Sequence, residues 1–161
     1  MFNINNYLNI PREVSTAAFG ITTTAAAGVL VQIIQSTPSS SSNILRNFAI
    51  YSCGSASIIG AVMTVYSMMR LCQKIVPERN ELAKSIGVTV LGGLSTALVQ
   101  AVGEHFWTIA PSFQSLGNRS MAYAVATNFA WQASLITGIG GIVFTASAAY
   151  RLGLAVINKS S

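Results

Sequence analysis

Four long stretches of this chain carry no charged side chain, and they constrain its fold more than any other feature. They contain 32, 23, 19 and 31 residues and cover residues 14–45, 47–69, 85–103 and 120–150. Roughly 20 apolar residues in a helix cross the hydrocarbon core of a bilayer, because a helix rises about 1.5 Å per residue. Each stretch is therefore long enough to form one transmembrane helix.

The composition supports the same interpretation. Hydrophobic residues make up 52% of the 161 residues, charged residues make up 8%, and the mean hydropathy is +0.55. A soluble domain has about 25% charged residues, so a soluble fold of this chain would lack most of its polar surface. We predict an all-α, polytopic membrane protein in which residues 1–161 form a single membrane domain. The four transmembrane helices are expected at residues 14–35, 47–69, 85–106 and 125–150.

The first of these helices has a competing interpretation, which is a cleaved signal peptide. Its run of threonines and alanines, residues 22–27, contributes little to the free energy of membrane transfer. A signal peptide begins with a positively charged segment, whereas residues 1–10 contain four asparagines and no basic residue. We therefore expect the first helix to be a membrane span.

One segment of the chain occurs twice. Residues 47–71 align without a gap with residues 128–152, and nine of the 25 positions are identical, where composition alone would give about two. Each copy is long enough to cross a bilayer, and each ends in Arg-Leu. We therefore predict two tandem helical hairpin repeats, residues 14–71 and 85–152. Copies separated by an even number of spans point the same way, so the repeats are expected to be parallel.

The distribution of lysine and arginine predicts the orientation of these helices. The N-terminus, the central loop and the C-terminal tail share one side of the predicted topology and carry seven basic residues. The two loops on the other side, which we call the outer loops, carry only Arg46 and Arg119. Basic segments remain on the cytoplasmic side of a membrane. Both termini of this integral membrane protein are therefore expected on the cytoplasmic or an equivalent side.

Small residues four positions apart predict where the helices touch. Burial of apolar surface does not drive helices together in lipid, so helices pack through small residues that let their backbones approach each other. The predicted packing residues are Gly60 and Thr64 in the second helix, Gly92 and Gly93 in the third, and Gly141 and Thr145 in the fourth. Packing within one four-helix bundle and an interface between copies of the chain both account for this spacing, and the first is the commoner case.

Four polar residues near the outer ends of the first and third helices are candidates for a polar lining. They are Gln32, Gln100, Glu104 and His105. A carboxylate inside a membrane is costly and often marks a cation or proton site. Glu104, however, is the twentieth residue after Lys84, which places it at the membrane boundary and favours a role as an interfacial anchor. The two glutamines are expected to form interhelical hydrogen bonds, with a pore lining as the alternative.

The loops and helix ends carry three further predictions. Asn47 and Asn128 are expected to cap the second and fourth helices. Residues 104–121 include the second outer loop and are rich in aromatic side chains, which indicates an interfacial or re-entrant segment. Basic residues around the central loop form the best candidate surface for a docking partner, and they are Arg70, Lys74, Arg79 and Lys84.

Motifs for catalysis, metal binding and nucleic-acid binding are absent from the sequence. The single histidine cannot complete a zinc site with Cys53 and Cys72, which lie 19 residues apart on one predicted helix. Phosphate-binding and nucleophile-elbow motifs do not occur. The net charge of +5 lies along the ends of the spans, without the basic stripe typical of nucleic-acid binding. We predict no enzymatic activity, no cofactor or metal, and no nucleic-acid partner.

The sequence favours a structural or assembly subunit of a membrane complex, or a membrane-inserted factor. Its expected partners are the lipid bilayer and either other membrane subunits or further copies of itself. The alternative is an oligomeric channel or small transporter lined by the polar residues of the first and third helices. A chain of 16.9 kDa with four helices encloses no roomy cavity alone, so conduction would require an oligomer.

Overall fold

The computed structural model describes residues 10–37, 43–76, 82–116 and 119–160, and most of these residues are helical. The helices are α2 (Ile10–Ser36), α3 (Asn43–Ile75), α4 (Leu82–Ile109) and α5 (Met121–Ser160). All four are long and apolar enough to cross a membrane. The predicted all-helical fold with four candidate spans is therefore confirmed, and it is the fold of a small multi-pass membrane protein.

The helices are longer than the predicted spans, and their true starts contradict two predicted caps. Because α3 begins at Asn43 and α5 at Met121, Asn47 and Asn128 lie inside helices and the prediction that they cap them is wrong. Ser120 caps α5 instead, since its Oγ accepts a hydrogen bond of 3.2 Å from the backbone N–H of Tyr123. With 40 residues, α5 is about 60 Å long and exceeds the thickness of a hydrocarbon core.

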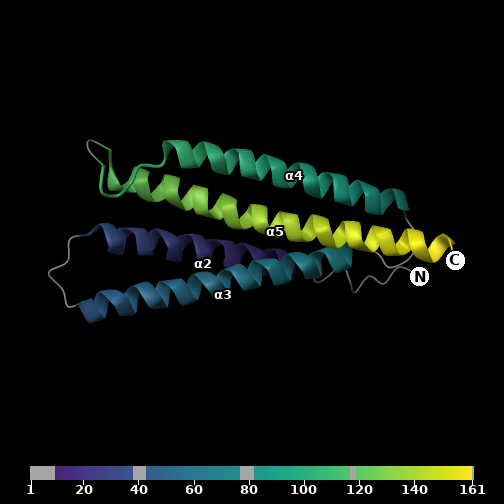
Figure 1. The fold of residues 1–161 in the computed structure, drawn as a ribbon, viewed down its shortest axis with the longest axis horizontal. Helices are drawn as coiled ribbons and strands as arrows, with labels where there is room; N and C mark the ends of the chain where they lie inside the picture. Colours follow the sequence, from purple (N-terminus) through teal and green to yellow (C-terminus); the bar gives the residue numbers. More distant parts are fainter. Residues whose placement is uncertain (1–9, 38–42, 77–81, 117–118, 161) are drawn as a thin grey trace.

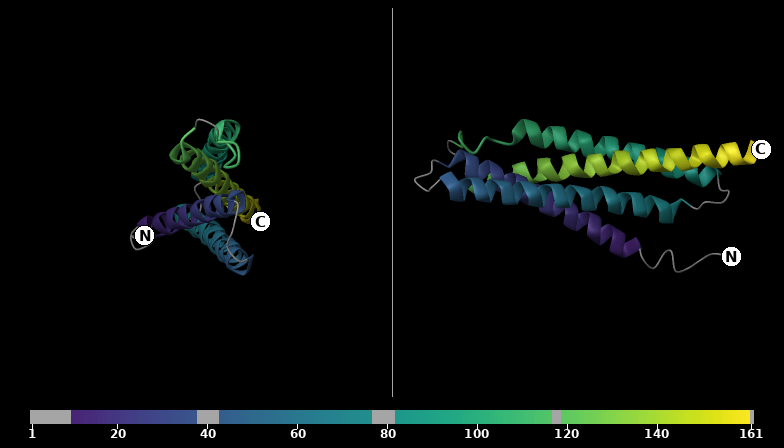
Figure 2. Two further views of the ribbon diagram at one scale, coloured as in Figure 1. Left: turned by 90° about the vertical axis from the view of Figure 1, so that its left-hand side faces the viewer. Right: turned by 60° about the horizontal axis from the view of Figure 1, so that its bottom comes forward.

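The helices pair as two hairpins that meet along α5 (Figure 1). α2 packs against α3, and α4 packs against α5; α5 also contacts both α2 and α3, whereas α4 has extensive contacts with α5 alone. Viewed end-on, the two hairpins form two splayed pairs (Figure 2). The arrangement therefore differs from a closed four-helix bundle, in which each helix would have two neighbours.

The two ends of the molecule differ in charge. The start of α2, the end of α3, the start of α4 and the end of α5 lie together (Figure 1). We call this the basic end, because it carries Arg12, Arg70, Lys74, Lys84 and Arg151. The opposite end, where α2 and α4 finish, is called the loop end.

Three arginines satisfy the last carbonyl groups of three helices. Arg46 donates to the carbonyl of Gln35 near the end of α2 at 2.9 Å. Arg119 donates to the carbonyl of Ile109 at the end of α4 at 3.3 Å, and Arg151 to that of Val76 just after α3 at 3.2 Å. The last carbonyls of a helix lack intrahelical partners and carry partial negative charge. A guanidinium group therefore both pairs with them and offsets the helix dipole.

Most buried side chains are small, and many large apolar ones point outward. The largest fully buried side chains are Val76, Thr64, Cys72 and Ser67. Phe19, Ile58 and Leu98 are instead 62–68% exposed. A soluble protein would bury these residues, but in lipid a large apolar side chain gains nothing by burial, so close backbone packing decides which residues face inward.

Two glycines lie at the contact between the hairpins. The side chain of Gln132 in α5 covers Gly28 in α2, and a Cβ atom at Gly28 would overlap it. A Cβ atom at Gly140 in α5 would lie 3.2 Å from both Met68 and Thr64 of α3. The hairpins are thus held together where glycine allows α5 to approach its neighbours.

We predict that Gly140→Leu weakens the contact between the hairpins. A leucine side chain there must displace Thr64 and Met68, and overpacking of this kind costs about 1–3 kcal/mol. The free energy of unfolding in detergent micelles should fall by that amount. Gly153→Leu is the matched control in α5, because no atom lies within 4 Å of a Cβ atom at that position. Equal stability of the two variants would refute this contact.

Candidate functional site

The α2–α3 hairpin is built around a crossing of two Gly-x-x-x-Thr motifs. Gly20 and Thr24 in α2 face Gly60 and Thr64 in α3. A Cβ atom at Gly20 would lie 2.5 Å from both the carbonyl oxygen of Gly60 and Oγ1 of Thr64. A Cβ atom at Gly60 would lie 2.5 Å from Oγ1 of Thr24. Only glycine fits at either position.

The α4–α5 hairpin contains the same kind of crossing. Here Gly92 and Thr96 in α4 face Gly141 and Thr145 in α5. A Cβ atom at Gly92 would lie 2.9 Å from Oγ1 of Thr145, and one at Gly141 would overlap Oγ1 of Thr96. In both hairpins, each glycine therefore makes room for the threonine hydroxyl of the partner helix.

The four threonine hydroxyls at these crossings are satisfied within their own helices. Each donates a hydrogen bond of 2.8–2.9 Å to the carbonyl of the glycine four residues earlier, in the pairs Thr24–Gly20, Thr64–Gly60, Thr96–Gly92 and Thr145–Gly141. Thr24 also donates to the carbonyl of Ser57 across the interface at 3.2 Å. An unpaired hydroxyl in lipid is costly, so this local bond lets a polar side chain occupy an apolar interface.

Five of the six residues predicted for helix packing lie at these crossings, and all face helices of the same chain. The sixth, Gly93, lies at the margin, where a Cβ atom would be 4.0 Å from Thr145. The sequence interpretation missed Gly20 and Thr24, although their spacing equals that of Gly60 and Thr64. These glycines therefore make their closest contacts within one chain.

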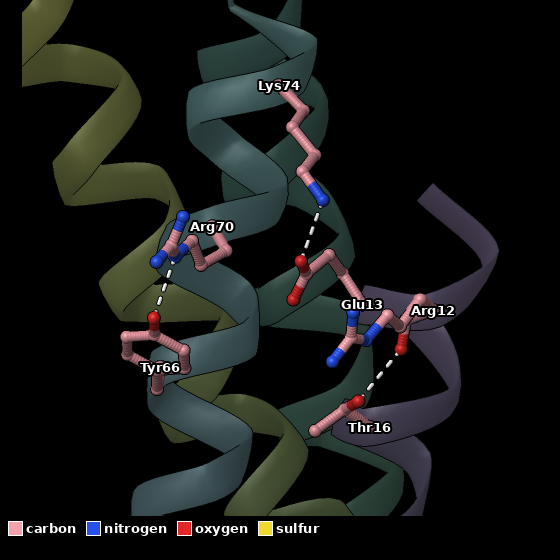
Figure 3. A network of polar contacts seen from close by, with 6 residues as sticks. All are labelled: Arg12, Glu13, Thr16, Tyr66, Arg70 and Lys74. Atoms are coloured by element: carbon pink, nitrogen blue, oxygen red, sulfur yellow. Dashed lines mark hydrogen bonds and ion pairs between the residues drawn. The ribbon is translucent and has the colours of Figure 1, made fainter. Parts of the chain in front are cut away.

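An ion pair joins α2 to α3 at the basic end (Figure 3). Nζ of Lys74 lies 2.7 Å from Oε1 of Glu13, and the two side chains are only 17% and 16% exposed. One turn away, Nε of Arg70 donates to the hydroxyl of Tyr66 at 2.8 Å, with the guanidinium 5.2 Å from the ring centroid. Partial burial strengthens the Lys74–Glu13 pair relative to an exposed one.

The four residues predicted to dock a partner have different environments. Lys74 is paired with Glu13, whereas Arg70 lies on the exposed surface of α3. Lys84 is half-buried near the start of α4, and Arg79 lies outside the described residues. The described members of this set therefore do not form one uniform basic surface.

A cavity of about 390 Å³ at the loop end brings together residues far apart in the sequence. It is lined by Gln32, Gln35 and Ser36 of α2, by Trp107 of α4, by residues 110–114, and by Asn128 of α5. Asn128 is 7% exposed and donates to the carbonyls of Pro111 at 3.1 Å and Ala124 at 2.8 Å. It thereby fixes the segment after α4 against α5. Within the predicted interfacial segment, residues 104–109 extend α4 and residues 110–116 are not helical.

The four candidate polar lining residues do not share one path through the described part of the chain. Gln100 and Glu104 line a second cavity of about 320 Å³ between α4 and α5. Gln32 lines the first cavity, and His105 is exposed, with its ring 6.0 Å from that of Phe106. No hydrogen bond is made by either glutamine side chain within the described residues, so the predicted interhelical bonds are not formed there. Gln32 faces the cavity, and Gln100 packs over Gly138.

A third cavity lies between the hairpins, where α4 lacks a second neighbour. It has a volume of about 370 Å³ and is mostly apolar. We call it the α3–α4 groove, and it is lined by Met68 and Leu71 of α3, by Val88, Leu91, Gly92, Ser95, Thr96 and Val99 of α4, and by Thr137, Gly141 and Phe144 of α5. This groove leaves the outer side of the Gly92–Gly141 crossing uncovered.

Comparison with known proteins identifies no relative. No protein-family model matches the chain, and no curated protein or solved structure matches it. Within the described residues, no group of three or more His, Cys, Asp and Glu side chains is placed to hold a metal ion. The helix contacts and the cavities are therefore the features of this chain that bear on its function.

We predict that Gly60→Leu and Gly92→Leu each destabilise one hairpin by about 1–3 kcal/mol or more, because the leucine side chain pushes the helices apart. Gly54→Leu in α3 and Gly87→Leu in α4 are the matched controls, since a Cβ atom at either position has no neighbour within 4 Å. Thermal unfolding in micelles measures the difference. Loss of stability in the controls equal to that in the test variants would show that the crossings are not the critical contacts.

Proposed function

We propose that this protein is a structural subunit of a membrane assembly and that the α3–α4 groove receives a transmembrane helix of another subunit. The observation that carries the proposal is the incomplete packing of α4, whose extensive contacts are with α5 alone. The groove beside it has the apolar lining that a transmembrane helix needs. Its floor carries small residues, Gly92, Thr96 and Gly141, which favour close approach of a helix backbone. The role is structural rather than catalytic.

The rigidity of each hairpin supports this role. The Gly-x-x-x-Thr crossings hold α2 to α3 and α4 to α5 within the chain, and the Lys74–Glu13 pair adds a second link between α2 and α3. A partner helix would thus meet a preformed surface. A preformed surface loses little conformational entropy on binding.

We also propose that the two hairpins are tandem parallel repeats. Gly60 and Thr64 correspond to Gly141 and Thr145 in the aligned segments, and both pairs lie at the crossing of their hairpin. Shared crossing geometry supports a common origin of the two halves. The equivalent positions in the first helix of each hairpin are then Gly20 and Gly92.

We propose that both termini and the central loop lie on the cytoplasmic or an equivalent side, because the basic end carries most of the lysines and arginines. In a background with Cys53 and Cys72 replaced by alanine, Ser115→Cys should react with a membrane-impermeant maleimide from outside. Ala83→Cys should react only after the membrane is permeabilised. Labelling of Ala83→Cys from outside, with Ser115→Cys protected, would reverse the orientation.

We expect Ser95→Phe to disrupt assembly. Ser95 lines the groove, and a phenyl ring there occupies the space of the incoming helix. Ala97→Phe is the matched control, because Ala97 is exposed on α4 and does not line the groove. Native mass spectrometry from mild detergent should show a complex for the parent chain and for Ala97→Phe, and at least a tenfold smaller bound fraction for Ser95→Phe.

The same measurement separates the alternatives. A complex that contains only copies of this chain would show that the helix in the groove comes from another copy. A monomer in every sample would refute the structural role. An oligomeric channel is tested in liposomes: cation flux that is lost in Glu104→Gln, with assembly intact, would favour conduction. We expect no flux, because Gln32 and Glu104 line separate cavities.

A further inference from the structure

The cavity between α4 and α5 at the loop end is formed by one face of each helix. Gln100, Gly103, Glu104 and Trp107 line it from α4, at the spacing of residues that share a helix face, and Trp131, Ser134 and Leu135 line it from α5. A Cβ atom at Gly103 would lie 3.0 Å from Cβ of Ser134. The helices are therefore in close contact at the base of this cavity of about 320 Å³.

The two tryptophans form an aromatic wall. Their ring centroids are 4.6 Å apart with an interplanar angle of 41°, and Trp107 is 60% exposed. Because the rings lie against each other, a ligand has access to an outer ring face and not to the space between the rings. An indole face attracts a cation placed within about 6 Å of the ring centroid.

Glu104 supplies an uncompensated negative charge beside this wall. The described part of the chain contains two carboxylates, and Glu13 is paired with Lys74. The carboxylate of Glu104 has neither an ion pair nor a hydrogen bond with any described residue. It shares the helix face of Trp107, so one ligand can contact both side chains.

From this geometry we infer that the cavity binds the ammonium group of a zwitterionic phospholipid headgroup, such as choline. A weakly hydrated organic cation satisfies the carboxylate and an indole face together. A bare metal ion is a poorer match, because calcium needs six to eight oxygen ligands and the cavity offers those of Gln100, Glu104 and Ser134.

The depth of the site favours a lipid over a soluble cation. Glu104 lies 20 residues beyond Lys84, about 30 Å along a helix, which equals the thickness of the hydrocarbon core. The cavity is therefore level with the headgroups when the basic end of α4 is at the opposite surface. Lipid ammonium groups are concentrated at that level. This site is separate from the α3–α4 groove, and its occupation does not depend on the proposed assembly.

Tryptophan fluorescence reports on this cavity, because both tryptophans of the chain line it. Trp107 also borders the cavity beside Gln32, whereas Trp131 lines only the cavity between α4 and α5 among the cavities described above. The full chain in maltoside micelles is titrated with dihexanoylphosphatidylcholine below its critical micelle concentration. We expect a saturable change in emission that dihexanoylphosphatidylglycerol does not produce. Glu104→Gln should weaken the apparent affinity roughly tenfold, the effect of losing one charge contact. His105→Gln, an exposed neighbour outside the cavity, should bind as the parent chain does.

Further measurements distinguish a lipid from a soluble source of the ammonium group and test whether each variant is folded. Tetramethylammonium chloride, compared with sodium chloride at equal ionic strength, should give at most a weaker response; saturation by this salt without a phosphatidylcholine response would overturn the lipid assignment. Trp107→Leu leaves Trp131 as reporter and should also weaken binding. Circular dichroism checks that each variant is helical. Unchanged affinity in folded Glu104→Gln or Trp107→Leu, or an equal response to phosphatidylglycerol, would overturn the site.

Discussion

The close approach of glycine backbones to threonine hydroxyls is the contact on which the rest of this structure depends. In lipid, apolar side chains gain nothing by leaving the solvent, so helices associate only where their backbones come close enough for dispersion and local polar contacts to act. Gly20, Gly60, Gly92 and Gly141 provide that approach. Each partner threonine fills the space above a glycine and donates its own hydroxyl within its helix, so the four crossing hydroxyls all have a hydrogen-bond partner.

Each hairpin is completed by its own crossing, and further residues make the contact between the hairpins, although Thr64 of α3 takes part in both. α5 provides the contact between the hairpins, with Gly140 against α3 and Gln132 over Gly28 of α2. A single helix that bridges two pairs leaves α4 with one extensive neighbour. The α3–α4 groove follows directly from this arrangement, and it is the reason that we assign the chain a role in assembly.

Several of the few charged residues in this chain pair with other groups near the ends of the helices. Glu13 and Lys74 join α2 to α3, and Arg46, Arg119 and Arg151 each pair with the last carbonyls of a helix. Of these basic residues, Lys74 and Arg151 lie at the basic end, whereas Arg46 and Arg119 lie at the loop end. Of the described carboxylates, Glu13 has an ion-pair partner and Glu104 does not. The unpaired carboxylate lies beside two tryptophans, and this arrangement is the basis of the proposed site for a cationic ligand.

The sequence by itself determined the four helices and part of their contacts, because uncharged length and the four-residue spacing of Gly60 and Thr64 are properties of a single helix. The sequence prediction placed the cap of α5 at the wrong residue. Asn128 and Ser120 are both good capping residues, and only the position at which the helix starts in the structure distinguishes them. The pairing of consecutive helices into hairpins was expected from the sequence, whereas the tertiary structure alone decided that the two hairpins dock through α5. The pairing of Glu13 with Lys74 depends on how α2 packs against α3, and the separation of Gln32 from Glu104 depends on how the two hairpins dock. Both are set by shape complementarity between faces distant in the sequence.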